Sequence, residues 1–492
     1  MQITLRKIDT SHLTLNEAAL SRCQRALELR DRGDFDGAQE VMSPLWKGIG
    51  QRLDTSGLHA SVAAEVLLCV GILTGWVGSR NENGDADGTA KDLITESIRY
   101  FESVGDVKKV AAAQAELAYC YWRTGALDEA RVMFTAALEK LTAPGNTRGN
   151  ALLGWSVVEW SDCRYDDALK ILNDNAPLFK KINNHAIRGF YHNQLAMVLR
   201  KLTAPQQQQN NIKRIITEYQ EADHQFKLAH NAVFRAMVKN NIGNLLRELS
   251  RFKEAHEYLN QARRLTVSVR DKVRTAQVDQ TRAHVLIAQG KYLEAERIAR
   301  LAGRSFEKAG RQRLLLDALI SRGIALARLH KTEGARFTFQ RAIEVAQHVG
   351  VPKQAGLAAL AMIEELDDLS IQTLAVAYER ANEWLADSQS PDLLRRINTA
   401  ASKLLARLQV ELITGEAADA IRNKPLDFAQ ELLRYERKLI KRALVQVDGS
   451  LTRAAANLRM SYQKLGYILE TRHQDLLKER TPIRRRAPPK RR

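Results

Sequence analysis

Small residues recur at fixed intervals along the chain, in segments where apolar residues repeat every three or four positions. Four segments align without gaps and share a central alanine, a small residue twelve positions before it and an alanine seven positions after it. These positions are Ala118, Ala130 and Ala137; Gly243, Ala255 and Ala262; Ala283, Ala295 and Ala302; and Gly323, Ala335 and Ala342. Apolar repetition of this kind predicts helices. Small residues let antiparallel helices cross closely, so the pattern predicts a series of helical hairpins.

Weaker copies of the pattern extend the hairpins over the first 387 residues. The further members are Ala26–Gly33–Ala38, Ser156–Cys163–Ala168 and helix pairs near 58–104, 187–229 and 354–387. A polar loop is expected at 204–209, where four glutamines follow a proline. About eight or nine hairpins are therefore predicted.

The hairpin pattern resembles that of the tetratricopeptide repeat (TPR) family. The positions that match the turn inside the family's hairpin are Gly125, Gly290, Cys163, Ser250 and His330. Ala255, Ala295 and Ala335 lie 40 residues apart, whereas the family repeats every 34, and this departure implies longer helices. We expect residues 1–387 to form a TPR-like α-solenoid with a period of about 34–40 residues.

The resemblance implies a concave face, lined by the first helix of each hairpin, that holds a protein or peptide. Three rows of polar residues lie at the inward positions of these helices. They are Asn193, Asn240 and Gln280; Asn244 and His284; and Arg200 and Arg247. Amides suit an extended peptide backbone and arginines suit a carboxylate. The alternative is that these residues form only an exposed polar face without a ligand.

A second pattern occupies residues 439–469 and predicts three further helices. The first has an apolar stripe of Leu439, Ile440, Ala443, Leu444 and Val447 and ends at Asp448-Gly449. The second follows Ser450, a possible N-cap, with Ala454, Ala455 and Leu458 on its apolar face. A turn through Arg459 and Met460 leads to Ser461, which suits the N-cap of the third. The third helix is expected to bury Leu465, Ile468 and Leu469 and to expose Tyr462, Gln463, Lys464 and Tyr467.

These residues resemble the Fis-type helix-turn-helix, also found at the C-terminus of NtrC-like activators. The resemblance implies binding to double-stranded DNA, with the third helix in the major groove. The sequence departs from the family in two ways: Arg459 stands where the family usually has glycine, and Tyr462 and Tyr467 stand on the third helix where it usually has basic residues. We expect phosphate contacts from Arg453 and Arg459 and base contacts from Ser461, Tyr462, Gln463 and Lys464. Tyr467, on the same exposed face, is also expected at the DNA.

Positive charge is concentrated at the C-terminal end. Residues 435–492 hold 16 Lys and Arg against 5 Asp and Glu, which gives +11 of the total +18. Such a basic end is typical of a surface that meets phosphates. Residues 481–492 are proline-rich and basic, so a disordered arm is expected, with Arg484, Arg485 and Arg486 on DNA phosphates. The alternative is a solvated tail that only aids solubility.

The chain is thus divided into four parts. Residues 1–387 form the solenoid, 388–426 a helical linker, 427–480 the helix-turn-helix and 481–492 the basic tail. The amphipathic helix at 426–447 is a possible homodimer surface, because Fis-like modules act as dimers.

Other function classes have little support in the sequence. We see no apolar run that approaches a membrane span and no signal peptide, so a cytoplasmic protein is expected. The four cysteines, Cys23, Cys69, Cys120 and Cys163, form no CxxC pair and are expected to be reduced and buried. No metal-ligand set, phosphate-binding glycine loop or catalytic constellation is recognisable, and neither enzyme activity nor a cofactor is predicted.

The sequence therefore predicts an all-α protein, a TPR-like α-solenoid followed by a Fis-type helix-turn-helix. The expected function is sequence-specific DNA binding in transcriptional regulation, with the solenoid as a protein-interaction or sensor region. The alternative is a non-catalytic scaffold or adaptor whose helix-turn-helix is vestigial or makes a protein contact.

Overall fold

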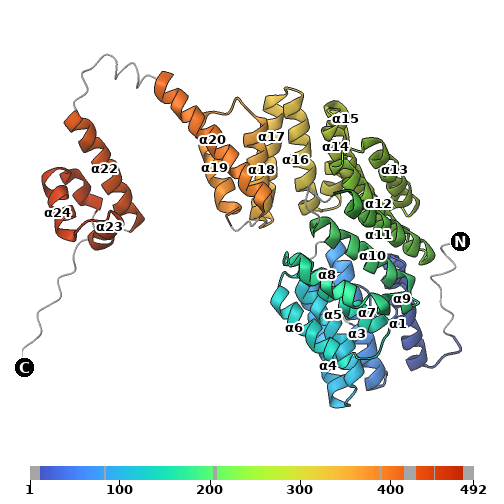
Figure 1. The fold of residues 1–492 in the computed structure, drawn as a ribbon. Coiled ribbons are helices and arrows are strands. Elements are labelled where there is room, and N and C mark those ends of the chain that lie inside the picture. The colour runs from blue at the N-terminus through green and yellow to red at the C-terminus, as the bar shows by residue number, and fades with distance from the viewer. Residues whose placement is uncertain are drawn as a thin grey trace, which may run out of the picture. The chain divides into compact units, whose positions relative to one another are not determined.

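A computed structural model describes residues 11–51, 53–81, 85–202, 208–386, 390–414, 428–447 and 449–479 (Figure 1). The chain forms two compact units, Met1–Ala400 and Ala401–Arg492. All regular elements of the described ranges are helices. The predicted polar loop, the end of the linker and the basic tail with Arg484, Arg485 and Arg486 lie largely or wholly outside these ranges.

Nine helical hairpins follow one another in the described part of the first unit. They are α1 (Leu15–Asp31) with α2 (Phe35–Met42), α3 (Ala60–Asn81) with α4 (Asp85–Ser103), α5 (Val107–Arg123) with α6 (Leu127–Lys140), α7 (Asn146–Ser161) with α8 (Tyr165–Asp174), α10 (His185–Leu202) with α11 (Gln208–Leu228), α12 (Ala232–Glu248) with α13 (Phe252–Ser268), α14 (Lys272–Ala288) with α15 (Tyr292–Lys308), α16 (Gln312–Arg328) with α17 (Thr332–His348), and α18 (Pro352–Glu365) with α19 (Ile371–Trp384). A short helix, α9 (Ala176–Lys181), follows α8, and α20 (Pro391–Thr414) follows the ninth hairpin. This arrangement confirms the predicted solenoid and its number of hairpins.

The predicted small positions are the places where helices cross closely. All twelve are buried. A Cβ atom at Gly323 would lie 2.6 Å from Cε1 of Phe339, and one at Gly243 would lie 2.6 Å from Cγ of Leu259. A methyl group therefore does not fit at these glycines, which explains why the pattern demands small residues there.

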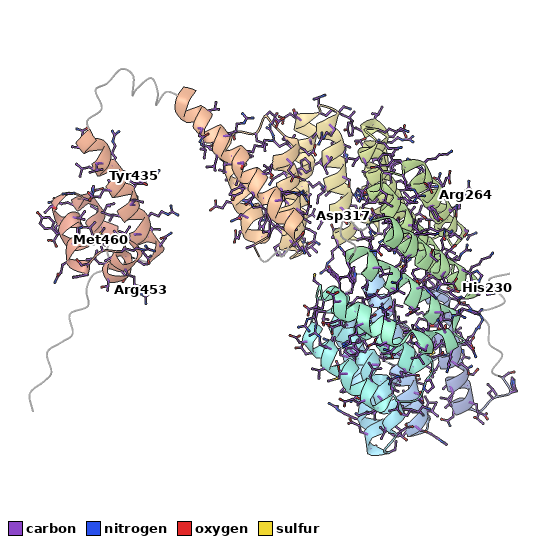
Figure 2. The ribbon with its side chains drawn as sticks, in the orientation of Figure 1. His230, Arg264, Asp317, Tyr435, Arg453 and Met460 are labelled. Atoms are coloured by element: carbon purple, nitrogen blue, oxygen red, sulfur yellow. The ribbon has the colours of Figure 1, made fainter. Side chains whose placement is uncertain are left out.

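The turns inside the hairpins share one backbone conformation. All five residues predicted at this position have positive φ angles between 57° and 81°: Gly125, Gly290, Cys163, Ser250 and His330. The next amide closes the turn, as where Lys291 N donates to Leu286 O at 2.9 Å. This bond belongs to the left-handed C-cap of a helix. Turns between hairpins use the same conformation, for example at His230, which Figure 2 labels.

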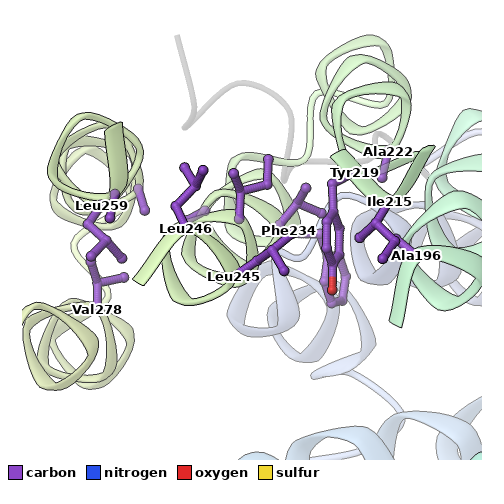
Figure 3. Packing of buried hydrophobic residues seen from close by; sticks show 14 of the residues in the cluster. Ala196, Ile215, Tyr219, Ala222, Phe234, Leu245, Leu246, Leu259 and Val278 are labelled. Carbon is purple, nitrogen blue, oxygen red and sulfur yellow. The ribbon is translucent and has the colours of Figure 1, made fainter. Parts of the chain in front are cut away.

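The core runs between successive hairpins as a continuous apolar layer. In the middle of the array it joins α10 to α14, and Figure 3 shows Leu246, Leu259 and Val278 lying together from three successive helices. Phe234 and the fully buried Tyr219 continue the same layer toward α10 and α11. Each hairpin therefore buries its apolar faces against both neighbours, as in other repeat proteins.

The first hairpin also contacts the sixth, 200 residues further along the chain. Asn231 Nδ2 donates to Asp31 O at 2.7 Å, and Asn184 Nδ2 donates to Asp31 Oδ2 at 3.1 Å. The side chain of Asn231 is fully buried, and its Oδ1 caps α12 by accepting from Phe234 N at 2.9 Å. The hairpins from α1 to α12 therefore close into a ring, which we call the N-terminal ring.

Two predictions about apolar and cysteine residues are corrected here. Residues Ala60–Gly78 of α3 are long and apolar enough to span a membrane, with a mean hydropathy of 1.9, so an apolar run of that length does exist. Because 67% of that stretch is buried inside the repeat array, its hydrophobicity serves the core. Among the cysteines, Cys163 is exposed, since it occupies a left-handed turn.

Candidate functional site

Three helices and a 3-10 segment form the described core of the second unit. They are α22 (Phe428–Gln446), α23 (Leu451–Asn457), α24 (Tyr462–Thr471) and η1 (Gln474–Glu479). Ile440, Leu444, Ala454 and Leu465 belong to one buried cluster, as the sequence pattern predicts. Leu439 is an exception: it is 40% exposed, because it lies at the edge of the stripe that Ile440 and Leu444 bury.

The turn between α23 and α24 has the conformation of a left-handed helix cap. Arg459 has φ +51°, and Met460 N donates to Ala455 O at 3.0 Å. Ser461 caps α24, since its Oγ accepts from Lys464 N at 3.2 Å, as predicted. Ser450 occupies the N-cap position of α23, but its side chain makes no capping hydrogen bond.

One face of this unit is polar and exposed around the start of α24. Its members are Arg453, Arg459, Ser461, Tyr462, Gln463, Lys464 and Tyr467, and all seven are exposed. Figure 2 labels Arg453 on α23 and Met460 in the turn. We call these seven residues the α24 face. Its exposure matches the expectation from helical periodicity.

A segment that the sequence pattern missed fastens α24 to α22. Leu476 of η1 is buried in the core of the unit. The buried His473 lies 3.1 Å from Glu436 (Nε2 to Oε2), and Arg437 donates to Asp475 at 2.5 Å. This Arg437 contact holds the pKa of the exposed Asp475 carboxyl below its usual value. The segment is only six residues long, too short for periodicity to reveal it.

In the first unit, the seven predicted groove residues lie on the first helices α10, α12 and α14. Successive first helices contact one another through most of the array. Arg200 donates to Glu248 from Nη2 at 2.5 Å and from Nε at 3.1 Å, and Arg247 Nη2 donates to the same carboxylate at 3.3 Å. Arg247 Nε also donates to Asn244 Oδ1 at 3.0 Å. The two arginines are therefore partly neutralised by one carboxylate.

The amide residues of the predicted groove join neighbouring helices. Gln280 Nε2 donates to Ser321 Oγ on α16 at 2.6 Å, and His284 Nε2 lies 2.8 Å from the same hydroxyl. Burial, aided by the nearby Arg247, lowers the pKa of His284 to about 4. Asn193 accepts from Asn241 at 3.2 Å. Asn240 Oδ1 is buried without a partner.

Sequence reasoning missed the same inward positions in the earlier hairpins. The groove rows lie three residues before and one and four residues after the first small position of a hairpin. Four residues after Ala26, Ala118 and Ser156, these rows reach Arg30, Trp122 and Trp160. All three line a cavity of about 300 Å³ inside the N-terminal ring. Repeat register was the signal that would have found them.

Comparisons with known proteins bear on the fold of the repeat array. No protein-family model and no curated protein sequence matches the chain. A solved structure of a signal transduction ATPase with numerous domains and a tetratricopeptide repeat sensor, from Pyrococcus horikoshii, is similar with a TM-score of 0.50 and 11% identity. The match covers 75% of this chain and 55% of that protein, so the chain spans little more than half the relative's length.

Two further solved structures show weaker likeness. A Rap protein complexed with competence and sporulation factor has a TM-score of 0.44 and 14% identity, covering 69% of this chain and 98% of that one. Yeast Tom70 has a TM-score of 0.45 and 14% identity, covering 82% and 85%. These scores are too low to add to the first likeness, which at 11% identity extends to the fold alone. By fold, the repeat array is a TPR-like α-solenoid.

Proposed function

We propose that the chain is a non-catalytic, cytoplasmic regulator of transcription that binds double-stranded DNA through its Fis-type helix-turn-helix. The observation that carries the proposal is the α24 face, where a capped helix presents polar side chains directly after a tight turn. This order of elements suits entry of α24 into a major groove. Gln463 and Lys464 are the residues best suited to contact base edges, since amides pair with adenine and lysines with guanine.

The phosphate contacts in this proposal come from residues beside α24. Arg453 lies in α23 and Arg459 in the turn that follows it, and both are exposed. The basic segment beyond the described residues contains Arg484, Arg485 and Arg486. The net charge of +11 on residues 435–492 adds long-range attraction to DNA. Phosphate contacts of this kind position the protein, whereas the α24 face would supply sequence preference.

A homodimer through α22 fits the same proposal. Leu432, Tyr435 and Leu439 are spaced by three and four residues and are 55%, 65% and 40% exposed. An exposed apolar stripe along a helix is typical of a protein contact. Two copies would place two α24 helices on two half-sites, so the dimer would bind DNA more tightly than one small unit alone.

The repeat array would receive a protein or peptide partner in this proposal. Partly exposed polar side chains on first helices, such as Asn244 and Arg247, support it. Because Glu248 already neutralises part of the arginine charge, a partner that binds there would have to offer hydrogen bonds as well as a carboxylate.

The full chain is the right material for the test. Genomic DNA fragments that the protein retains would be selected at about 50 mM salt, and affinity would then be measured up to about 200 mM. Six or more phosphate contacts should reduce affinity about a thousandfold over this range. Lys464→Ala should change the preferred sequence. Lys170→Ala, an exposed lysine on α8, removes the same charge from the repeat array and should not.

Absence of retained DNA at low salt would contradict the proposal and favour the scaffold or adaptor alternative. The feature that favours this alternative is the exposure of Tyr462 (43%) and Tyr467 (66%), because aromatic side chains are common at protein interfaces. Recovery of protein partners before and after nuclease treatment separates the two functions. Partners that depend on Tyr467 but survive nuclease would support the adaptor.

A further inference from the structure

The N-terminal ring encloses a cavity of about 300 Å³. First helices of six successive hairpins contribute to its wall: α1, α3, α5, α7, α10 and α12. The wall is mainly apolar, and its aromatic side chains include Trp76, Tyr119, Trp122, Trp160, Phe190 and Phe234. A volume near 300 Å³ and a mostly apolar wall are typical of sites for small organic molecules.

The aromatic wall is held in place by contacts within it. Phe190 meets Phe234 edge to face at 4.6 Å between ring centroids, and Tyr119 meets Trp122 at 6.5 Å. The polar ends of the second pair are bonded to the protein: Tyr119 Oη donates to Asn150 O at 2.9 Å, and Trp122 Nε1 donates to Ser161 Oγ at 2.8 Å. These bonds fix the rings, so the cavity is formed before any ligand arrives.

Two hydrogen-bond donors of the wall have no partner. Gln194 is only 6% exposed, and both its Nε2 and the Nε1 of Trp160 are buried without a hydrogen bond. Both residues line the cavity. Leaving a buried donor unpaired is costly, and native proteins rarely do so without a functional reason. Neither nitrogen faces the open volume of the cavity, so a bound molecule would accept from one of them only after the Gln194 amide or the Trp160 ring rotates.

The charged groups of the wall largely compensate one another. Arg30 Nη2 lies 2.9 Å from Asp31 Oδ1, and Arg30 Nη1 lies 3.9 Å from Glu116 Oε1. Burial raises the pKa of the Glu116 carboxyl, and Arg30 opposes this shift. The formal charges of Arg30, Asp31 and Glu116 sum to −1, so a further buried anion would be repelled. A cation would be attracted by the carboxylates but would lose its hydration beside the Arg30 guanidinium. The wall therefore favours a molecule without net charge.

We propose that this cavity binds one small, neutral, mainly aromatic or aliphatic organic molecule whose carbonyl or similar acceptor bonds to the Gln194 amide once that side chain rotates toward the cavity. This site includes Asn193 of the predicted inward rows, but none of the predicted polar residues of α12 and α14 and no residue of the α24 face. A ligand there contacts six hairpins at once and binds only the closed ring, so it stabilises the native N-terminal ring by mass action. The proposal does not depend on DNA binding.

The test uses the full chain and the fluorophore 2-acetyl-6-dimethylaminonaphthalene (acedan), a neutral naphthalene that carries one carbonyl acceptor. Trp76, Trp122 and Trp160 line the cavity, so bound acedan should accept excitation energy from tryptophan and shift its emission to shorter wavelength. We expect saturable binding of one acedan per chain. No saturable binding up to about 1 mM would overturn the proposal.

A pair of valine substitutions locates the probe. Val157→Trp, on the cavity wall, should fill the space and weaken acedan binding at least about tenfold. Val132→Trp is the matched control, because Val132 is 61% exposed on α6 and does not line the cavity. Thermal unfolding of both variants checks that they fold. Equal binding by Val157→Trp and the wild type would place acedan elsewhere and overturn the proposal.

A second variant tests the unpaired donor without filling the cavity. Gln194→Leu keeps much of the side-chain volume and removes the amide. It should weaken acedan binding about three- to tenfold, the loss expected for one hydrogen bond, and should raise the melting temperature of the ligand-free protein. Unchanged acedan affinity in Gln194→Leu would contradict the role given to this donor, even where Val157→Trp behaves as expected.

Discussion

Arg459 allows the stability of the C-terminal unit to be separated from its DNA affinity. Its φ of +51° lies in the left-handed region, which costs an L-amino acid roughly 1–2 kcal/mol and costs glycine nothing. Glycine also makes the unfolded chain more flexible, and this cancels roughly 0.4–1 kcal/mol of the stability gained by removing the strain. Arg459→Gly should therefore stabilise the unit by about 0.5–1 kcal/mol.

Arg453→Gly is a matched control that should change the stability of the unit in the opposite direction. Arg453 is also exposed, but it lies within α23, where glycine costs about 1 kcal/mol relative to good helix formers. Amide hydrogen exchange of α24 in the full chain reports both changes. Converted to equilibrium constants at 25 °C, these free energies correspond to about two- to fivefold slower amide exchange in Arg459→Gly and about fivefold faster exchange in Arg453→Gly.

The two variants should nevertheless lose DNA affinity to a similar extent. Each removes one positive charge beside α24, so each should reduce the salt dependence of binding by about one phosphate contact. Faster exchange in both variants would refute the argument that the backbone at Arg459 is strained. Unchanged DNA affinity in both would refute their assignment as phosphate contacts.

Three further outcomes are expected. Gly323→Ala should destabilise the array by about 1–3 kcal/mol in chemical unfolding, because the new methyl group meets Phe339 at 2.6 Å, whereas Gly466→Ala in α24, with open space around it, should not destabilise. His284 is neutral in the folded state down to about pH 4, so the unfolded chain takes up a proton first as pH falls below about 6.5. Stability should drop by on the order of 2–3 kcal/mol between these values, and His284→Gln should reduce that drop. Asn231→Asp keeps the cap on α12 but loses the donor to Asp31, so hydrogen exchange in α1 should accelerate; unchanged exchange would mean that this bond does not hold the ring.

Much of the solenoid was predictable because close helix crossings restrict the residues that fit. A glycine such as Gly323 is buried against an aromatic ring, and the same restriction returns in each hairpin, so it is visible as a repeat. The left-handed turn at His330 was found by register rather than by residue type, since histidine gives no turn signal of its own. The exposed side of α24 followed from helical periodicity in the same way.

The N-terminal ring and its cavity were not predicted, because they depend on how small rotations between hairpins add up. No local pattern links Asp31 to Asn231, and repeat register places Trp160 on the inward face without showing that the ring closes around it. The same limit applies to Gln280, which was expected to face a ligand and instead bonds to Ser321 on the next hairpin. Whether Gln280 bonds to the protein or to a ligand depends on the distance between α14 and α16, which the local sequence does not show.

The contact between the first and sixth hairpins has a consequence for how the chain acquires its structure. In a linear repeat array each unit depends only on its neighbours, so folding can start at one end and spread. Here the hydrogen bond from Asn231 to the carbonyl of Asp31 joins residues 200 positions apart, and contacts between such distant residues are slow to form. During synthesis the first five hairpins should remain only loosely assembled until the sixth emerges, and afterwards the six should unfold together as one cooperative block.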